Sequence, residues 1–217
     1  MPVLSTRRFL TRRHCLGAGL AMAALSGIAQ ARAEEAAVVD WLRGKATATS
    51  LLGVTRTLHA GAAVEEGDEL RTLSGSRLSL QLVSGAMLAM GELSRLVVTH
   101  ETAAAEGGGS VILDLLDGIV RAMLGPARPD IFEVRGRAAV AAARGTNFIV
   151  ESTNTTTAVF TAAGTVVVTA VMAPGAGEVV LGPGQGVDAV RGQKLGPVKN
   201  WGAARVADFE ARTAVGG

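Results

Sequence analysis

Tyrosine is absent from this chain of 217 residues, and the other aromatic residues amount to five Phe and two Trp. This scarcity argues against large ring-lined pockets of the kind that hold many cofactors. Glycine, by contrast, is abundant at 28 residues, and 48% of the chain is hydrophobic. That composition favours thin packed layers joined by many tight turns, in a chain long enough to bury the core of one ordinary domain.

The first 33 residues predict an export signal rather than part of the fold. Arg12 and Arg13 precede an uncharged apolar stretch at 16–31, which is typical of a twin-arginine signal; an ordinary Sec signal is the alternative. Ala31 and Ala33 supply the small residues that signal peptidase requires, so we expect cleavage after Ala33. The apolar stretch is shorter than the roughly 20 residues that a transmembrane helix needs.

Cleavage at this point changes what the charges imply. The leader carries five Arg and no acidic residue, which leaves 16 basic and 19 acidic residues and a net charge of −3. The basic sequence pI of about 9.2 therefore comes from the leader. Overall composition gives no case for nucleic acid or anionic lipid as a partner. Cys15, the only cysteine, leaves with the leader, so the mature chain has no disulfide or thiolate metal site.

The remainder reads as strands separated by glycine turns. Apolar residues alternate with other residues in four stretches, each interrupted by a turn signal, as half-buried strands do. These stretches are 77–90 with Ser84-Gly85, 111–123 with Asp117-Gly118, 158–170 with Gly164, and 178–190 with Gly182 to Gly186. We therefore predict an all-β fold, a short-stranded β-sandwich or β-solenoid-like domain with a short C-terminal helix.

Other segments are assigned by composition. Glu35–Leu42 reads as a short helix or a lead-in. Gly- and Pro-rich stretches at 101–110, 125–130 and 172–178 predict loops. Trp201, Val206 and Phe209 recur at near-helical spacing within 200–215, which indicates an amphipathic helix that packs on the sheet or docks elsewhere. The expected organisation is a signal at 1–33, a lead-in at 34–60, a β domain at 61–192 and a tail at 193–217.

Several of these features together resemble the periplasmic domain of the FecR family. A Gly-Asp turn leads to a Thr, a Gly-Ser and a glycine turn, then to an Arg-Gly-Thr-x-Phe signature and a final turn glycine. The matching residues are Gly67, Asp68, Thr72, Gly75, Ser76, Gly85, Phe132, Val134, Arg144, Gly145, Thr146, Phe148, Val150 and Gly164. The resemblance implies a periplasmic interaction module.

The chain also departs from the family pattern. Ser84 stands where the family usually has Asp, and Gly136-Arg137 replaces a Thr-Pro. The best-known members carry a cytoplasmic anti-sigma region and a transmembrane helix, neither of which we recognise here. We therefore do not expect the transmembrane relay of those members to operate in this chain.

The stretch "RAAVAAARGTNFIV" (137–150) has a structural interpretation. The alanine run reads as a closely packed strand, Gly145 as a bend or bulge, and Thr146 and Phe148 as the return into the sheet, with Phe148 in the core. Arg144 is expected to bond carbonyls or pair with a carboxylate. Arg144 is also the weak candidate for a ligand-binding residue.

No set of residues predicts catalysis. His59 and His100 are isolated, and Asp114 and Asp117 stand three apart, which places them on opposite faces of a strand. The acidic residues at 65–69 are expected to form a solvated turn without calcium-loop spacing. Arg121, Arg128, Arg135 and Arg137 are expected to scatter rather than form a patch. No metal, cofactor or enzyme activity is predicted.

The expected function is therefore that of an exported periplasmic binding module. The first hypothesis is envelope sensing or signalling by protein contact, through an exposed strand edge or the C-terminal segment. The alternative is a structural protein that associates with cell-wall glycan. Neither nucleic acid nor a membrane-spanning segment of the mature chain forms part of the prediction.

Overall fold

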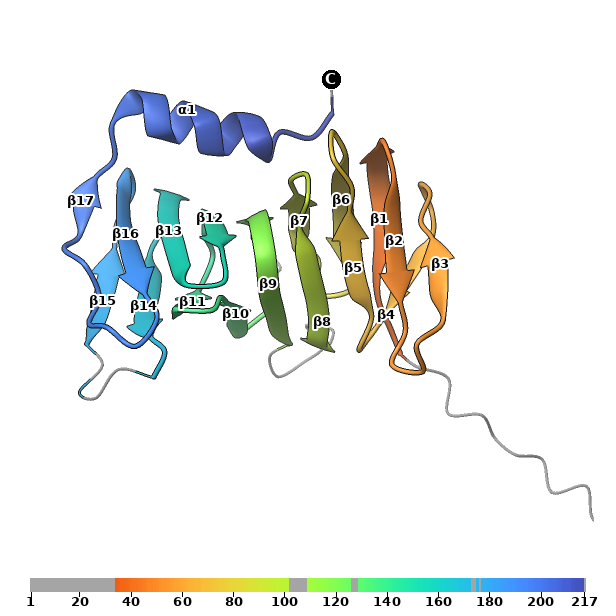
Figure 1. The fold of residues 1–217 in the computed structure, drawn as a ribbon, viewed down its shortest axis with the longest axis horizontal. Coiled ribbons are helices and arrows are strands. Elements are labelled where there is room, and N and C mark those ends of the chain that lie inside the picture. Colours follow the sequence, from red (N-terminus) through yellow and green to blue (C-terminus); the bar gives the residue numbers. More distant parts are fainter. Residues whose placement is uncertain (1–33, 102–108, 126–128, 173–174, 176, 217) are drawn as a thin grey trace, which may run out of the picture. The chain divides into compact units, whose positions relative to one another are not determined.

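A computed structural model describes residues 34–101, 109–125, 129–172, 175 and 177–216. The expected export signal, with Arg12, Arg13, Ala31 and Ala33, lies outside these residues, as do parts of the three expected loops. Within the described ranges, 17 strands form one continuous open sheet of mixed direction, and a single helix follows them (Figure 1). The predicted all-β fold with a short C-terminal helix is confirmed.

The continuous sheet folds into two layers, which we call sheet A and sheet B. Sheet A contains, in spatial order, β4 (Ala63–Glu65), β1 (Glu35–Arg43), β6 (Arg77–Leu82), β7 (Met87–Met90), the second part of β9 (Ser110–Met123), β12 (Asn147–Ser152), β13 (Thr156–Ala163), β16 (Gln185–Val190) and β17 (Lys199–Asn200).

Sheet B has the same kind of order. It contains β3 (Thr55–Thr57), β2 (Ala46–Thr49), β5 (Glu69–Thr72), β8 (Arg95–Glu101), the first part of β9, β10 (Ile131–Arg135), β11 (Ala139–Ala143), β14 (Val166–Ala170) and β15 (Glu178–Leu181). Neighbouring strands are antiparallel, apart from the parallel pair of β9 and β10.

Strand β9 corrects the turn predicted at Asp117-Gly118. The strand runs without reversal from Ser110 to Met123, pairing with β8 and β10 before Gly118 and with β7 and β12 from Gly118 onward. Gly118 has a φ of 92°, and a β-carbon there would lie 2.3 Å from the Ser94 hydroxyl. The glycine therefore lets one strand bend from sheet B into sheet A.

Two other predicted turns also join layers instead of forming hairpins. Gly164 connects β13 of sheet A to β14 of sheet B, and the glycines at 182–184 connect β15 of sheet B to β16 of sheet A. The Ser84-Gly85 turn does form the predicted hairpin, between β6 and β7. Gly85, Gly164 and the glycines at 182–184 therefore mark chain reversals, whereas Gly118 does not, and the layer of the next strand depends on long-range pairing.

The segment Glu35–Leu42, for which a short helix was one alternative, lies in strand β1. β1 pairs with both β4 and β6 and has a bulge between Val39 and Trp41. Consecutive buried residues at Ala36 and Ala37 obscure the alternation that marks most strands here. Residues 34–60, expected as a lead-in, thus contribute β1, β2 and β3 to the two sheets.

One hydrophobic core lies between the two sheets. Leucine, valine and alanine side chains of both sheets form it, as the aromatic-poor composition predicted. Its largest side chains include Phe132 of sheet B and Phe148 of sheet A, whose rings meet edge to face with centroids 6.0 Å apart. Phe148 is fully buried and so joins the two layers at the centre of the C-terminal half.

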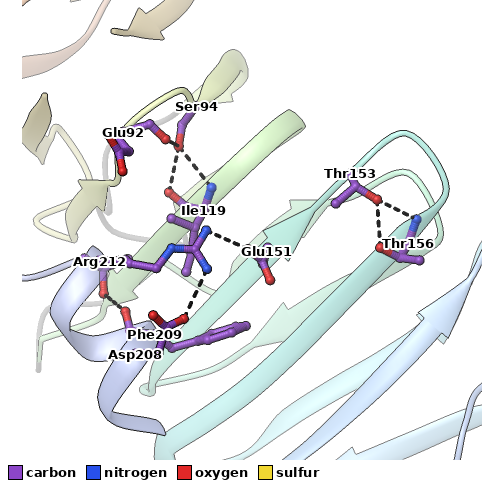
Figure 2. Close-up of polar contacts among 10 residues, drawn as sticks. Glu92, Ser94, Ile119, Glu151, Thr153, Thr156, Asp208, Phe209 and Arg212 are labelled. Atoms are coloured by element: carbon purple, nitrogen blue, oxygen red, sulfur yellow. Dashed lines mark hydrogen bonds and ion pairs between the residues drawn. The ribbon is translucent and has the colours of Figure 1, made fainter. Parts of the chain in front are cut away.

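The helix α1 (Ala203–Arg212) packs on the outer face of sheet A, as the packing alternative predicted. Its buried residue, Phe209, contacts a small second cluster that includes Ile119, Ile149 and Phe160. Arg212 forms ion pairs with Glu151, at 2.6 Å, and with Asp208 (Figure 2). No helix within the described ranges is long and apolar enough to cross a membrane.

Candidate partner-binding surface

The Arg144-Gly145-Thr146 turn carries the chain from β11 of sheet B to β12 of sheet A. Gly145 has a φ of 70°, in the left-handed region where a β-carbon is strained. Arg144 points into solvent, with its side chain 68% exposed, and forms an ion pair of 3.1 Å with Asp130. Thr146, directly before β12, is buried. The turn is therefore a crossover whose charged residue remains on the surface.

A cavity of about 380 Å³ opens beside Arg144 on the outer face of sheet B. The Arg144–Asp130 pair forms part of its wall, and the rest comes from β10, β11 and β14 through residues such as Ile131, Ala142 and Val167. Ile131 is 50% exposed although it is fully apolar. The site thus combines an apolar floor with a charged rim.

The apolar floor continues from the cavity to the edge of the sheet. Ala142 pairs with Val167, and Val167 pairs with Val180 on β15. Val180 is 57% exposed. A row of small apolar side chains therefore crosses three strands and ends at the outermost strand of sheet B.

Within the described residues, β15 pairs with β14 alone, so its other side has unpaired backbone groups. The strand reads Glu-Val-Val-Leu and contains no lysine or proline, the residues that commonly protect an exposed edge. The outer face of sheet A differs, because α1 covers it at β9, β12 and β13. The row from Ala142 to Val180 and the free edge of β15 together form what we call the β15 surface.

A second cavity, of about 500 Å³, lies on the other side of the same turn. It is lined by Met87 and Met123 of sheet A together with Gly145, Thr146 and other residues. Arg144 and its ion pair do not contribute to this cavity, and no unpaired strand edge adjoins it. Of these two cavities, the one beside Arg144 is therefore the better placed for a protein partner.

Other sequence-selected residues hold the fold together. Asp68, expected in a solvated turn, is instead buried: its carboxylate accepts bonds from the Arg56 guanidinium, one of 3.0 Å, and from the Glu65 amide at 2.8 Å. The Arg56 guanidinium balances the negative charge of the buried Asp68 carboxylate. The prediction that Asp68 lies in a solvated turn was therefore wrong. Gly67, Gly85 and Gly164 all have positive φ values in turns.

The isolated histidines remain apart. The His59 ring bonds only its neighbouring carbonyl, while His100 lies 3.5 Å from a Glu66 oxygen. Asp114 accepts a bond from Thr99 on the outer face of sheet B. Arg121 belongs to sheet A and Arg135 to sheet B, while Arg128 lies outside the described residues.

Glu101, which sequence reasoning missed, is buried beside the β6–β7 turn. Its Oε1 accepts a 2.7 Å bond from the Ser84 amide, and its Oε2 has no partner among the described residues. Burial raises the pKa of Glu101 to about 7, against the lowering effect of the Ser84 bond and of nearby His100. A glutamate that ends a strand before a glycine-rich stretch carries no sequence signal of burial.

Comparison with known proteins agrees with this architecture. The family model "FecR protein" matches residues 68–167, which run from buried Asp68 through the Arg-Gly-Thr turn to Val167 of the cavity. No curated protein matches the chain.

Two crystal structures of a "putative anti-sigma factor" from Parabacteroides distasonis ATCC 8503, at 1.65 and 2.50 Å resolution, have similar folds. Each shows a TM-score of 0.51 and 18% identity over 65% of this chain. The similarity covers 63% of those chains, so less than two thirds of their length is represented, and it concerns the fold alone.

Proposed function

Because residues 68–167 match the FecR family model, we propose that this chain is a signalling or sensing module of the cell envelope that acts by binding a protein rather than by catalysis. The export signal read from the sequence supports a periplasmic location after cleavage at Ala33. The structural neighbours described as anti-sigma factors support a regulatory role for the same fold.

The observation that carries the proposal is the contrast between the two outer faces. On sheet A, α1 covers Ile119, Ile149 and Phe160. On sheet B, the row from Ala142 to Val180 has no such cover among the described residues and ends at an unpaired edge. Since exposed apolar rows beside free edges favour strand addition, the β15 surface is the place where a partner segment binds.

The geometry also specifies the partner. An extended segment that pairs with β15 extends sheet B by one strand, so its alternate side chains lie beside Val180 on the outer face. Those side chains should be apolar, because the neighbouring row is apolar. Arg144 and Asp130 at the cavity rim offer opposite charges to polar groups of the same partner. The partner is therefore a protein with an accessible, amphipathic β-strand.

Capture from periplasmic extract tests the proposal. Mature wild-type protein should retain a discrete envelope protein, and Val180→Lys should abolish this retention, because lysine protects a strand edge. Leu52→Lys is the matched control: Leu52 is 92% exposed in the β2–β3 loop, at the opposite end of sheet B. Hydrogen exchange should show new protection of β15 amides in the complex.

Three results would contradict this function. Retention that survives Val180→Lys, or that is lost equally with Leu52→Lys, would place binding elsewhere. Sedimentation with peptidoglycan that neither substitution changes would favour the cell-wall alternative.

Arg144→Ala separates the two roles considered for Arg144. Loss of retention at an unchanged melting temperature would make Arg144 a recognition residue, and a lowered melting temperature with intact retention would make it structural.

A further inference from the structure

Most arginines that the structure describes have a partner. Arg56, Arg95, Arg135, Arg144, Arg205 and Arg212 form ion pairs, and Arg121, Arg137 and Arg191 bond an amide, a carbonyl and a thioether. Within the same described ranges, Arg43, Arg71 and Arg77 have none. All three belong to the N-terminal half of the molecule.

Two of these arginines are direct neighbours. Arg43 ends β1 and Arg77 begins β6, and the two residues stand opposite each other in the antiparallel ladder. Like charges in directly opposed positions destabilise a sheet, because their β-carbons lie only about 5 Å apart. The pair therefore has an unbalanced positive charge that an anion between the two guanidinium groups would neutralise.

The backbone holds this pair in place. Gly44, which follows Arg43, touches Ser76, which precedes Arg77: a β-carbon on Gly44 would lie 2.4 Å from the Ser76 hydroxyl. The Lys45 backbone amide donates a 2.8 Å bond to the same hydroxyl, which holds the Lys45 backbone at this crossover. Lys45 has no ion-pair partner among the described residues. Three cationic residues without ion pairs among the described residues thus stand at one tight crossover between the sheets.

We propose that Arg43, Arg77 and Lys45 form a binding site for a phosphate group. The planar guanidinium fork matches phosphate oxygens, and two opposed forks with an adjacent ammonium provide donors from several directions. This phosphate site is separate from the β15 surface, since β1 and β6 lie in the N-terminal half of sheet A and β15 ends the C-terminal half of sheet B. The phosphate is carried by an anionic lipid headgroup or by a soluble molecule.

The first arm of the test uses vesicles of phosphatidylglycerol mixed with phosphatidylcholine. Mature wild-type protein should sediment with them, and the double variant Arg43→Gln, Arg77→Gln should bind roughly thirty-fold more weakly, from about 1 kcal/mol per basic residue at an anionic surface. The matched control is Lys194→Gln, Lys199→Gln, which removes the same charge from two exposed lysines without ion pairs elsewhere in the described chain. It should bind like the wild type.

The second arm uses inorganic phosphate against chloride at equal ionic strength. Phosphate should raise the melting temperature of the wild type more than that of the Arg43→Gln, Arg77→Gln variant, since a ligand of the native state stabilises by mass action. Phosphate also stabilises proteins in general, and comparing the wild type with the variant in the same salt cancels that effect. Arg43→Lys, Arg77→Lys retains charge without the fork and should lose most of the phosphate effect.

The outcomes distinguish the sources. Vesicle binding that depends on Arg43 and Arg77 indicates a lipid headgroup, and a phosphate effect without vesicle binding indicates a soluble phosphate. Equal loss of vesicle binding in both glutamine double variants would show diffuse attraction and overturn the proposal. If the wild type neither bound vesicles nor gained stability from phosphate, the proposal would be overturned as well. The Arg43→Gln, Arg77→Gln variant should remain folded, because it loses only a repulsive contact.

Discussion

Phe209→Ala tests whether α1 is a permanent cover of sheet A. Phe209 is 3% exposed, its ring meets Trp201 edge to face at 4.9 Å, and it packs with Ile149 and Phe160. Truncating a buried phenylalanine costs about 3–5 kcal/mol in a core. The other contacts of the helix include the partly buried Val206, surface ion pairs worth about 0–1 kcal/mol each, and the Arg205 guanidinium 3.5 Å from the Trp201 ring centroid, worth roughly 1 kcal/mol.

Without the Phe209 ring, the remaining contacts do not offset the entropy of ordering the ten residues of α1, so the helix should detach as a unit while the sheets stay folded. Trp201 reports this directly in a Trp41→Phe background, where it is the sole tryptophan. Its emission should shift to the red, and amides of 203–212 should exchange rapidly. An unchanged emission maximum together with retained protection of α1 would refute the assignment of Phe209 as the residue that holds the helix.

Three further predictions concern the core, a buried carboxyl group and the leader. Phe148→Ala should cost about 3–5 kcal/mol and lower the melting temperature by roughly 10 °C in circular dichroism, because Phe148 spans the layers; a melting curve unaltered by the change would place it outside the core. The pKa of Glu101 is raised to about 7 from 4.5, so the native state binds the extra proton between these values and stability should fall as pH rises from about 4.5 to 7. Glu101→Gln should remove that slope in urea titrations at successive pH values, and a slope that persists would assign it to another group. Replacing both Arg12 and Arg13 by lysine should leave precursor in the cytoplasm on immunoblots of cell fractions, whereas normal Sec-dependent export would contradict the twin-arginine reading.

The strand content was predictable from the sequence because alternation and glycine turns are local signals. Leu78, Leu80 and Leu82 alternate toward the core, as strand β6 requires. Alternation identifies which side chains face the core, but strands of either layer present the same pattern. Gly164 therefore read as a hairpin turn although it joins the two sheets. For the same reason Gly118 read as a reversal although it bends a continuous strand.

The candidate site was predictable only at Arg144. The cavity beside it requires Ile131 from β10 and Val167 from β14, and the pairings that bring these residues together join distant parts of the chain. Burial of Glu101 and the opposition of Arg43 to Arg77 likewise follow from ladder register. Register is set by the whole sheet, and a single stretch of sequence does not contain it.

The continuous strand β9 has a consequence for how the molecule folds. It pairs with β7 and β8, which precede it closely in the chain, and with β10 and β12, which follow it closely. Its pairings span moderate loops, as between Met87 and Met123 or Gly118 and Ser152, and these close at a smaller entropic cost than a pairing between the two ends of the chain. Nucleation is therefore expected at β9, with growth of both layers outward toward the two ends of the chain. The outermost strands, β3 and β15, would then be added last and open first, so the edge that we assign to partner binding is also the part of sheet B that a partner stabilises most.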